Sequence, residues 1–282
     1  MLEGWVSEPT RRDTKFPLRL DQLAAPKQRP APPPAGKTRT TTHSGAAGPS
    51  AARARPYTPP GGLGLDSADI RRRMVSRLRA EGVVSQALLD AMALVPRHQF
   101  VDTALVTQAY EDTSLPIGHG QTISKPSVVA RMIDLLLQGA NARDREGLGN
   151  TLEIGTGCGY QAAVLSCLAR SVISVERLRA LHDKARDLLA PMRSSRLRLV
   201  YGDGMLGHAP NAPYDSIIAA AGGATVPQAW LDQLAVGGRL ISPVRQGAGG
   251  QQVLVVIDRT QHGLDHRIHE AVNFVPLKSG LI

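Results

Sequence analysis

The feature that most constrains the fold is a short apolar run that leads into three glycines at alternate positions, Thr151-Leu-Glu-Ile-Gly-Thr-Gly-Cys-Gly-Tyr160. A helix-like run from Gln161 to Ala169 follows it. An apolar segment, a glycine turn and a helix in this order are typical of the start of a βαβ unit. Glycines suit the turn because side chains would block a ligand lying against its backbone, and because some of the φ values needed are costly for other residues. The stretch therefore predicts a ligand site between a strand and a helix.

The surroundings of the glycines indicate which ligand the turn binds. Gly159 comes one position too early for the dinucleotide fingerprint G-x-G-x-x-G, and no Gly-Lys-Ser/Thr follows to make a P-loop. Glu153 precedes the turn, where its carboxylate would repel a pyrophosphate and attract an ammonium. S-adenosyl-L-methionine offers that ammonium together with a sulfonium and carries no phosphate, so we predict it as the cofactor.

Two further acids follow the next two apolar segments. Glu176 ends the first of them at about the ~20-residue spacing that places a carboxylate on ribose hydroxyls. Asp203 follows the second, the predicted strand Leu197–Tyr201, and is placed to accept a hydrogen bond from an adenine amine. Each acid alone could be a solvated loop carboxylate, but together with the turn they predict a cofactor cleft. Its predicted residues are Glu153, Gly155, Thr156, Gly157, Cys158, Gly159, Glu176, Arg177, Gly202, Asp203 and Gly204.

Few cysteines and no long apolar run favour a cytoplasmic protein. Cys158 and Cys167 are the chain's two cysteines, too few and too badly placed for a disulfide framework. No run approaches the ~20 apolar residues of a membrane helix. The N-terminal residues have neither the apolar core of a secretory signal nor the acid-poor character of a transit peptide.

Residues 1 to 65 differ in composition from the rest of the chain. They hold 11 of the 20 prolines and, with 10 Lys and Arg against 4 Asp and Glu, contribute +6 of the formal net charge of +9. Such a segment cannot bury enough apolar surface to offset its ordering entropy, so we predict a disordered basic extension. It could contact a polyanion weakly, although an inert solvated extension is the simpler interpretation. Residues 66 to 282 are the predicted methyltransferase domain.

Two helices are predicted before the glycine turn. The first begins at Asp66 or Ser67, has apolar residues at helical spacing and ends at Gly82. Its many arginines indicate a charged solvent face rather than a nucleic-acid patch. The second helix begins at Ser85 and runs to Leu94.

A polar stretch rich in turn formers, Tyr110 to Pro126, predicts a long functional loop ahead of a helix from Ser127 to Leu137. Pro126 fits the first turn of that helix. Ser124 lies close to the helix N-terminus, a place suited to an anion, although a plain helix cap would explain a serine there equally well.

Four stretches carry a family resemblance. They are Val95-Pro-Arg97, Ala109-Tyr-Glu-Asp112, Leu115-Pro-Ile-Gly-His-Gly-Gln-Thr-Ile-Ser124 and Val272-Asn-Phe-Val-Pro-Leu277. With the glycine turn, they resemble the protein-L-isoaspartate O-methyltransferase family in unbroken order over about residues 67 to 277. The resemblance implies that the chain methylates the α-carboxyl of isoaspartyl residues in damaged proteins and peptides. It also implies that Ser124 is the active-site residue and that Gln121, Thr122 and Ile123 line the cofactor and the substrate.

The chain departs from that family at three places. Cys158 stands where serine is usual, and Lys125 where glutamine or alanine is usual. Cysteine is nearly isosteric with serine, so we expect cofactor binding to be intact. Residues 1 to 65 have no counterpart.

The remaining segments predict the other half of a sheet. The fold class expected is α/β: a doubly wound, mostly parallel seven-stranded Rossmann-like methyltransferase sheet with an N-terminal helical cap. After the fourth strand, Ala219 to Gly223 lacks the aromatic residue that stacks on a flipped base, which argues against a nucleic-acid substrate. The expected elements are strands at Tyr214–Ala219, Gly237–Pro243, Gln251–Ile257 and Ile268–Val275, and a helix at Val226–Leu234.

The expected chemistry needs no general base, because a carboxylate with an unperturbed pKa near ~4 is already ionised at neutral pH. We expect Ser124 to orient the substrate carboxylate with help from Thr122, and His98 and His119 to be structural. The expected partners are isoaspartyl-containing proteins and peptides, with no metal, no membrane and no nucleic acid, and the expected state is a monomer. An RNA or other small-substrate methyltransferase and a non-catalytic adaptor of the same fold are the alternatives.

Overall fold

The computed structural model describes residues 68–247 and 250–282. The predicted disordered extension, residues 1 to 65, lies outside the described residues, as do Asp66 and Ser67, the predicted caps of the first helix. The expected domain boundary at residue 65 lies outside them as well.

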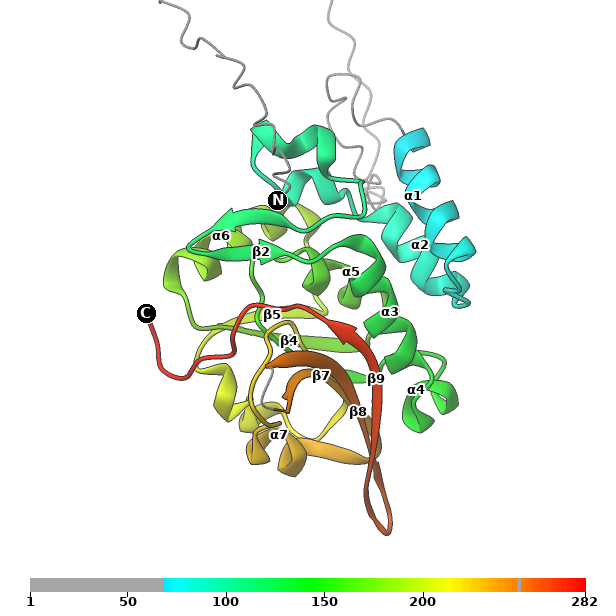
Figure 1. Cartoon of the computed structure of the whole chain (residues 1–282), viewed down its shortest axis with the longest axis vertical. Coiled ribbons are helices and arrows are strands. Elements are labelled where there is room, and N and C mark those ends of the chain that lie inside the picture. The colour runs from blue at the N-terminus through cyan, green and yellow to red at the C-terminus, as the bar shows by residue number, and fades with distance from the viewer. Residues whose placement is uncertain (1–67, 248–249) are drawn as a thin grey trace, which may run out of the picture. The chain divides into compact units, whose positions relative to one another are not determined.

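A seven-stranded sheet forms the centre of the described fold (Figure 1). Its strand order is β5-β4-β3-β6-β7-β8-β9, so the chain moves outward from β3 in both directions and β3 lies at the switch point. Strands β3 to β7 pair in parallel, whereas β8 pairs antiparallel with both β7 and β9. This confirms the mostly parallel, doubly wound sheet. The strands are β3 (Asn150–Ile154), β4 (Ser171–Glu176), β5 (Leu197–Tyr201), β6 (Tyr214–Ala219), β7 (Leu234–Gln246), β8 (Gln251–Thr260) and β9 (Gly263–Val272).

Alternating residues of the central strands are buried in two separate cores. On β6, Ile217 belongs to one core and Ile218 to the other, and neither side chain is exposed. Trp230 of α7 (Gln228–Gln233) fills the smaller core and donates from its indole nitrogen to the Gly204 carbonyl at 2.7 Å. Burial on both faces explains why these strands are continuous apolar runs.

The larger core lies under the helices that follow one another from α1 to α6. α1 and α2 pack on each other and on α3 and α5, and so form the predicted N-terminal helical cap. Ser85 caps α2, as the sequence predicts, by accepting a hydrogen bond from the Leu88 amide at 3.3 Å. The helices are α1 (Ala68–Ala80), α2 (Gln86–Leu94), α3 (Pro126–Leu137), α4 (Ala140–Asp144), α5 (Tyr160–Leu168) and α6 (Arg179–Leu189), with short 3-10 helices η2 (Arg97–Phe100) and η3 (Thr103–Gln108) before α3.

The stretch predicted as a long loop contains a small antiparallel hairpin. Its strands are β1 (Leu115–Gly118) and β2 (Gln121–Ile123). Leu115, Ile117 and Ile123 are almost fully buried, so the hairpin is held by packing onto the larger core. Two of its residues, Gly118 and Gly120, have positive φ on either side of the turn.

The antiparallel end of the sheet also differs from the expected boundaries. β7 begins at Leu234, earlier than the predicted Gly237, and takes over the last residue of the predicted helix. β9 ends at Val272, and the chain beyond it runs as a C-terminal segment, residues 274–282, back toward the centre of the sheet (Figure 1). Among the described helices, none is long and apolar enough to span a membrane.

Candidate active site

A cavity of about 220 Å³ opens at the carboxyl ends of the parallel strands. The residues that follow β3, β4, β5 and β6 supply its floor, and β2 and the C-terminal segment supply two walls. In Figure 1 that segment passes along the same side of the sheet as β2. The site therefore lies where a doubly wound sheet places its ligand.

Eleven of the predicted residues line this cavity, and four do not. Those that line it are Gln121, Thr122, Ile123, Ser124, Gly155, Thr156, Gly157, Cys158, Glu176, Arg177 and Gly204. Those outside the lining are Glu153, Gly159, Gly202 and Asp203.

The glycine turn presents bare backbone to the cavity. Gly155 and Gly157 have φ values of 90° and 57°, where other residues are strained. A Cβ added to Gly157 would come within 3.2 Å of the Ile117 side chain, and one added to Gly204 within 2.6 Å of Ile154. A side chain at Gly157 would therefore crowd the hairpin, and one at Gly204 would clash with β3.

Glu176 ties the turn to the end of β4. Its two carboxylate oxygens accept hydrogen bonds from the backbone amides of Gly157 and Leu178, each at 2.9 Å. The side chain is nearly buried yet lines the cavity. A carboxylate can accept further hydrogen bonds beyond these two, so Glu176 keeps acceptor capacity for ligand hydroxyls.

Glu153 is placed differently from the prediction, which set it beside the cofactor's ammonium. It is fully buried behind the turn, where Gln161 donates to one carboxyl oxygen at 3.0 Å and the Ser174 hydroxyl bonds the other. Ser174 also bonds the Thr156 hydroxyl at 2.6 Å. Because Thr156 and Gln161 line the cavity, Glu153 supports the cavity wall without reaching the cavity itself.

Burial raises the pKa of the Glu153 carboxyl to about 8, so the group is neutral at pH 7. The folded state then keeps a proton that the unfolded chain releases above its usual pKa of ~4.3. Stability should therefore fall as pH rises from that value to about 8, by at most ~1.4 kcal/mol per pH unit. Glu153 therefore lowers the free energy of unfolding at high pH.

A Glu153→Gln variant, which resembles the neutral acid and cannot ionise, isolates this contribution. Between about pH 5 and pH 8 we expect its free energy of unfolding to rise relative to wild type by about 1 kcal/mol per pH unit, and then to stay level relative to wild type. Urea unfolding of both proteins across this range measures the difference. A difference independent of pH would show that Glu153 is ionised in the folded protein.

Asp203 lies beside the cavity and already binds the C-terminal segment. Its carboxylate accepts from the Met205 amide at 2.9 Å and from the Gly280 amide at 2.7 Å. Arg177 holds the same segment by donating to the carbonyls of Gly280 and Ser279. Val275, Pro276, Leu277, Lys278 and Ile282 complete that wall.

Ser124 lies two residues before the start of α3 and does not cap the helix. The N-cap is Lys125, which makes no side-chain capping bond. The α3 N-terminus, where the sequence suggests an anion, holds the protein's own Asp112, which accepts from the Ser127 amide at 2.8 Å and hydroxyl at 2.7 Å. Ser124 is partly exposed and lines the same cavity as the glycine turn. The plain-cap interpretation of Ser124 is therefore wrong.

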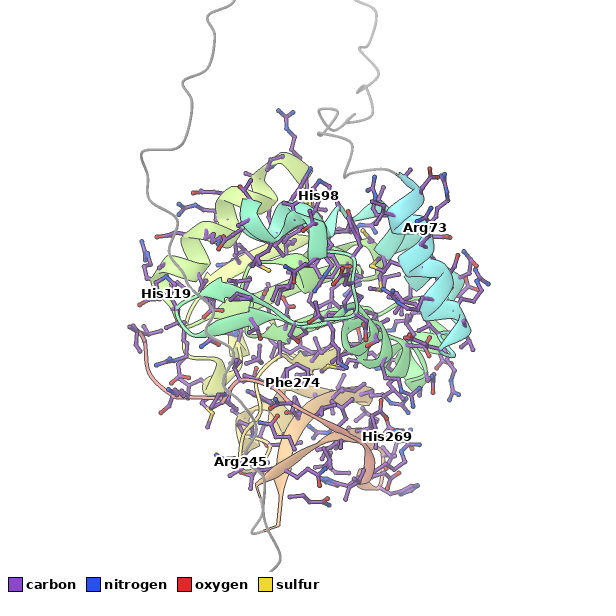
Figure 2. The ribbon with its side chains drawn as sticks, turned by 45° about the horizontal axis from the view of Figure 1, so that its top comes forward. Arg73, His98, His119, Arg245, His269 and Phe274 are labelled. Atoms are coloured by element: carbon purple, nitrogen blue, oxygen red, sulfur yellow. The ribbon has the colours of Figure 1, made fainter. Side chains whose placement is uncertain are left out.

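Two other predictions concern the histidines and Cys158. His98 lies in η2 (Figure 2), and its Nδ1 is 2.7 Å from the Tyr110 hydroxyl. His119 lies at the exposed tip of the β1–β2 hairpin (Figure 2). It has a φ of 54° and is among the residues that line the cavity. Cys158 is buried at the cavity, and burial raises the pKa of its thiol to about 11, so it stays neutral like the serine it replaces.

The cavity fits a ligand such as S-adenosyl-L-methionine on several structural grounds. Bare backbone at Gly155 and Gly157 allows close approach, and the carboxylate of Glu176 keeps acceptor capacity at the cavity. Ser124 and Thr122 line the same cavity. Among the described residues, no group of three or more His, Cys, Asp or Glu is arranged to hold a metal ion.

A protein-family model described as protein-L-isoaspartate(D-aspartate) O-methyltransferase matches residues 69–281. A protein-L-isoaspartate O-methyltransferase of Methylibium petroleiphilum is 60% identical over 278 residues, which cover 98% of this chain and 99% of that protein. One of Leptothrix cholodnii is 64% identical over 221 residues, which cover 78% of this chain and 77% of that protein.

Solved structures agree with these sequence matches. A protein-L-isoaspartate O-methyltransferase superposes with a TM-score of 0.66 at 27% identity, covering 75% of this chain and 67% of that chain. A Plasmodium falciparum protein described as a putative protein-L-isoaspartate O-methyltransferase, in complex with S-adenosyl-L-homocysteine, superposes with a TM-score of 0.61 at 22% identity, covering 74% and 98%. The second likeness supports the fold.

Proposed function

Because the chain belongs to the protein-L-isoaspartate(D-aspartate) O-methyltransferase family, we propose that it methylates the α-carboxyl of isoaspartyl residues in damaged proteins and peptides. The methyl donor in this proposal is S-adenosyl-L-methionine. The observation that carries it is that Ser124 and the glycine turn line the same cavity. A donor on the turn and an acceptor at the serine would then meet inside that cavity.

We assign the cofactor to the floor of the cavity. Gly155, Gly157 and Gly204 give it room, and Glu176 accepts from its ribose hydroxyls. Asp203, which lies beside the cavity, keeps the proposed contact with the adenine amine. Glu153, Gly159 and Gly202 act through the shape of the turn and the strand ends. Gln121, Ile123, Thr156, Cys158 and Arg177 complete the proposed cofactor contacts.

The acceptor binds at the opposite wall in this proposal. The Ser124 hydroxyl donates to one oxygen of the α-carboxylate, and Thr122 assists, so that the other oxygen points at the donor. S-adenosyl-L-methionine would supply a methyl group bound to a positively charged sulfur. As the carboxylate oxygen bonds to the methyl carbon, the carbon–sulfur bond would break and the sulfur would leave as a neutral thioether. The chain's part is to align the groups and to exclude water, which can be worth ~7–11 kcal/mol.

The acceptor is already ionised at neutral pH, so the proposal needs neither a general base nor a metal. We also propose that residues 66 to 282 are the methyltransferase domain and that the chain acts as a cytoplasmic monomer. The family match to residues 69–281 supports the domain, and the two free cysteines support a reducing compartment.

Methyl transfer from labelled cofactor to an isoaspartyl peptide tests the activity. We expect the isoaspartyl peptide to be labelled and its ordinary-aspartate twin to remain at background, because only the isomerised residue presents an α-carboxyl on a side branch. Labelling of RNA but of neither peptide would contradict the proposal. Binding of the cofactor without any turnover would instead indicate an adaptor.

A further inference from the structure

Arg97 is a buried cation directly behind the serine of the proposed active site. It starts η2, and its side chain has no exposed surface. Its Nε donates to the Ala109 carbonyl and one terminal nitrogen donates to the Ser124 carbonyl, both at 2.7 Å. The guanidinium carbon lies 4.8 Å from the centre of the Tyr160 ring.

The charge of Arg97 is not neutralised by an acid in contact with it. Among residues 68–247 and 250–282 it forms no ion pair, and its third nitrogen is buried without a hydrogen-bond partner. The carboxylate of Asp112 interacts favourably with the guanidinium through space, but it makes its hydrogen bonds to Ser127. Burial lowers the pKa of Arg97, but a guanidinium stays charged throughout the physiological range.

A buried charge without an ion-pair partner in contact with it is expensive, and an apolar residue of similar length would fill this space at lower cost. A role in packing alone therefore does not explain an arginine. The contacts point to a role at the site, because Arg97 bridges the chain before the hairpin, the Ser124 segment and the first residue of α5. Tyr160 follows the glycine turn directly and lines the cavity.

We propose that Arg97 is a positioning residue that fixes Ser124 against the glycine turn and whose positive charge draws the acceptor carboxylate into the cavity. This inference rests on the proposed function, since it assumes an anionic acceptor at Ser124. Its hydrogen bond holds the Ser124 carbonyl and with it the orientation of the serine. Its field acts across a buried region, where water screens it weakly.

The proposal has two parts that different substitutions separate. Arg97→Met introduces an apolar side chain of similar length and removes both the charge and the hydrogen bonds. Arg97→Lys keeps the charge but cannot reach both carbonyls with a planar fork. The matched control is Arg77→Met, since Arg77 donates to the neighbouring Tyr110 carbonyl at 2.8 Å and has no contact with Ser124.

Steady-state kinetics on an isoaspartyl peptide, with cofactor affinity measured by calorimetry, test both parts. We expect Arg97→Met to lower kcat about tenfold and to raise the peptide KM about tenfold, with the cofactor Kd within about twofold of wild type. Arg97→Lys should restore the peptide KM but not kcat. Arg77→Met should change neither constant by more than about twofold.

A purely structural role would lower the unfolding temperature of the variants without this division between kcat and KM. The inference fails if Arg97→Lys retains wild-type kcat, or if Arg97→Met changes the cofactor Kd as much as the peptide KM. Should Arg97→Met not fold, the kcat and peptide KM of Arg97→Lys alone decide. A wild-type protein that leaves the isoaspartyl peptide unmethylated would overturn the proposed function and this inference together, whereas unaffected variants of an active wild type overturn the inference alone.

Discussion

Replacing Ser124 with alanine is expected to lower kcat for an isoaspartyl peptide on the order of 100-fold, the usual cost of losing one hydrogen-bond donor aimed at a reacting oxygen. Ser124 lines the same cavity as the glycine turn, and alanine leaves the backbone and the neighbouring packing in place. Cofactor affinity should stay within about twofold of wild type, because the floor of the cavity is untouched. Single-turnover methylation and calorimetric titration of the cofactor give the two numbers.

Ser171→Ala is a suitable control for this experiment. Ser171 is the first residue of β4 and so lies at the amino ends of the parallel strands, away from the cavity. Its hydroxyl donates to the Asn150 side chain at 2.9 Å. It should methylate at the wild-type rate. A Ser124→Ala protein as active as this control would remove Ser124 from the mechanism, and equal losses of activity and cofactor affinity would place it on the donor instead.

Replacing Glu176 with alanine is expected to raise the cofactor Kd about 100-fold. The variant loses the acceptor for the Gly157 and Leu178 amides as well as the proposed contact with ribose hydroxyls. Hydrogen bonds to a charged group are each worth ~1.5–3 kcal/mol, and a loss of ~2.7 kcal/mol is a 100-fold change in Kd. With saturating cofactor, kcat should recover substantially, because Ser124 is unaffected.

Calorimetry with the cofactor product or the cofactor itself measures this effect. Glu176→Gln should fall between alanine and wild type, since an amide has only one oxygen to offer the two backbone donors. Glu270→Ala, which removes a surface acid paired with Arg131 at 2.9 Å, should bind as wild type does. Wild-type affinity in Glu176→Ala would show that the end of β4 takes no part in cofactor binding.

The central strands were predictable because their signal is local. β5 and β6 have the predicted bounds, Leu197–Tyr201 and Tyr214–Ala219, since each is a short apolar run bounded by polar or turn-forming residues. The β1–β2 hairpin was missed because its strands are only four and three residues long and include a proline and a glycine. Its order comes from burial of side chains against residues distant in sequence, which no local pattern reports.

The placement of Glu153 shows how far a strand-end acid can be interpreted. On β3, Leu152 and Ile154 face the smaller core, so alternation turns Glu153 to the opposite face, beneath α5. There it pairs in register with Ser174 of β4, the residue that bonds it. The alternation was visible in the sequence and would have argued for an internal acid.

The C-terminal wall of the cavity could not be foreseen from local sequence. It reaches the site through two hydrogen bonds with Gly222, one from the Gly222 amide to the Val275 carbonyl and one from the Leu277 amide to the Gly222 carbonyl, both at 2.9 Å. These join residues more than fifty positions apart. The family resemblance identified the motif in this segment but gave no reason why the segment should border the cavity.

The Asp112 carboxylate on Ser127 has a consequence for substrate choice. The N-terminus of a helix can bind small anions, and free amino acids and organic acids that could bind there are abundant in cells. In this protein the Asp112 carboxylate occupies that position, and because it belongs to the same chain its local concentration is very high. A free carboxylate therefore has no open place at this helix N-terminus, and in the proposed function the acceptor carboxylate is bound by Ser124 instead.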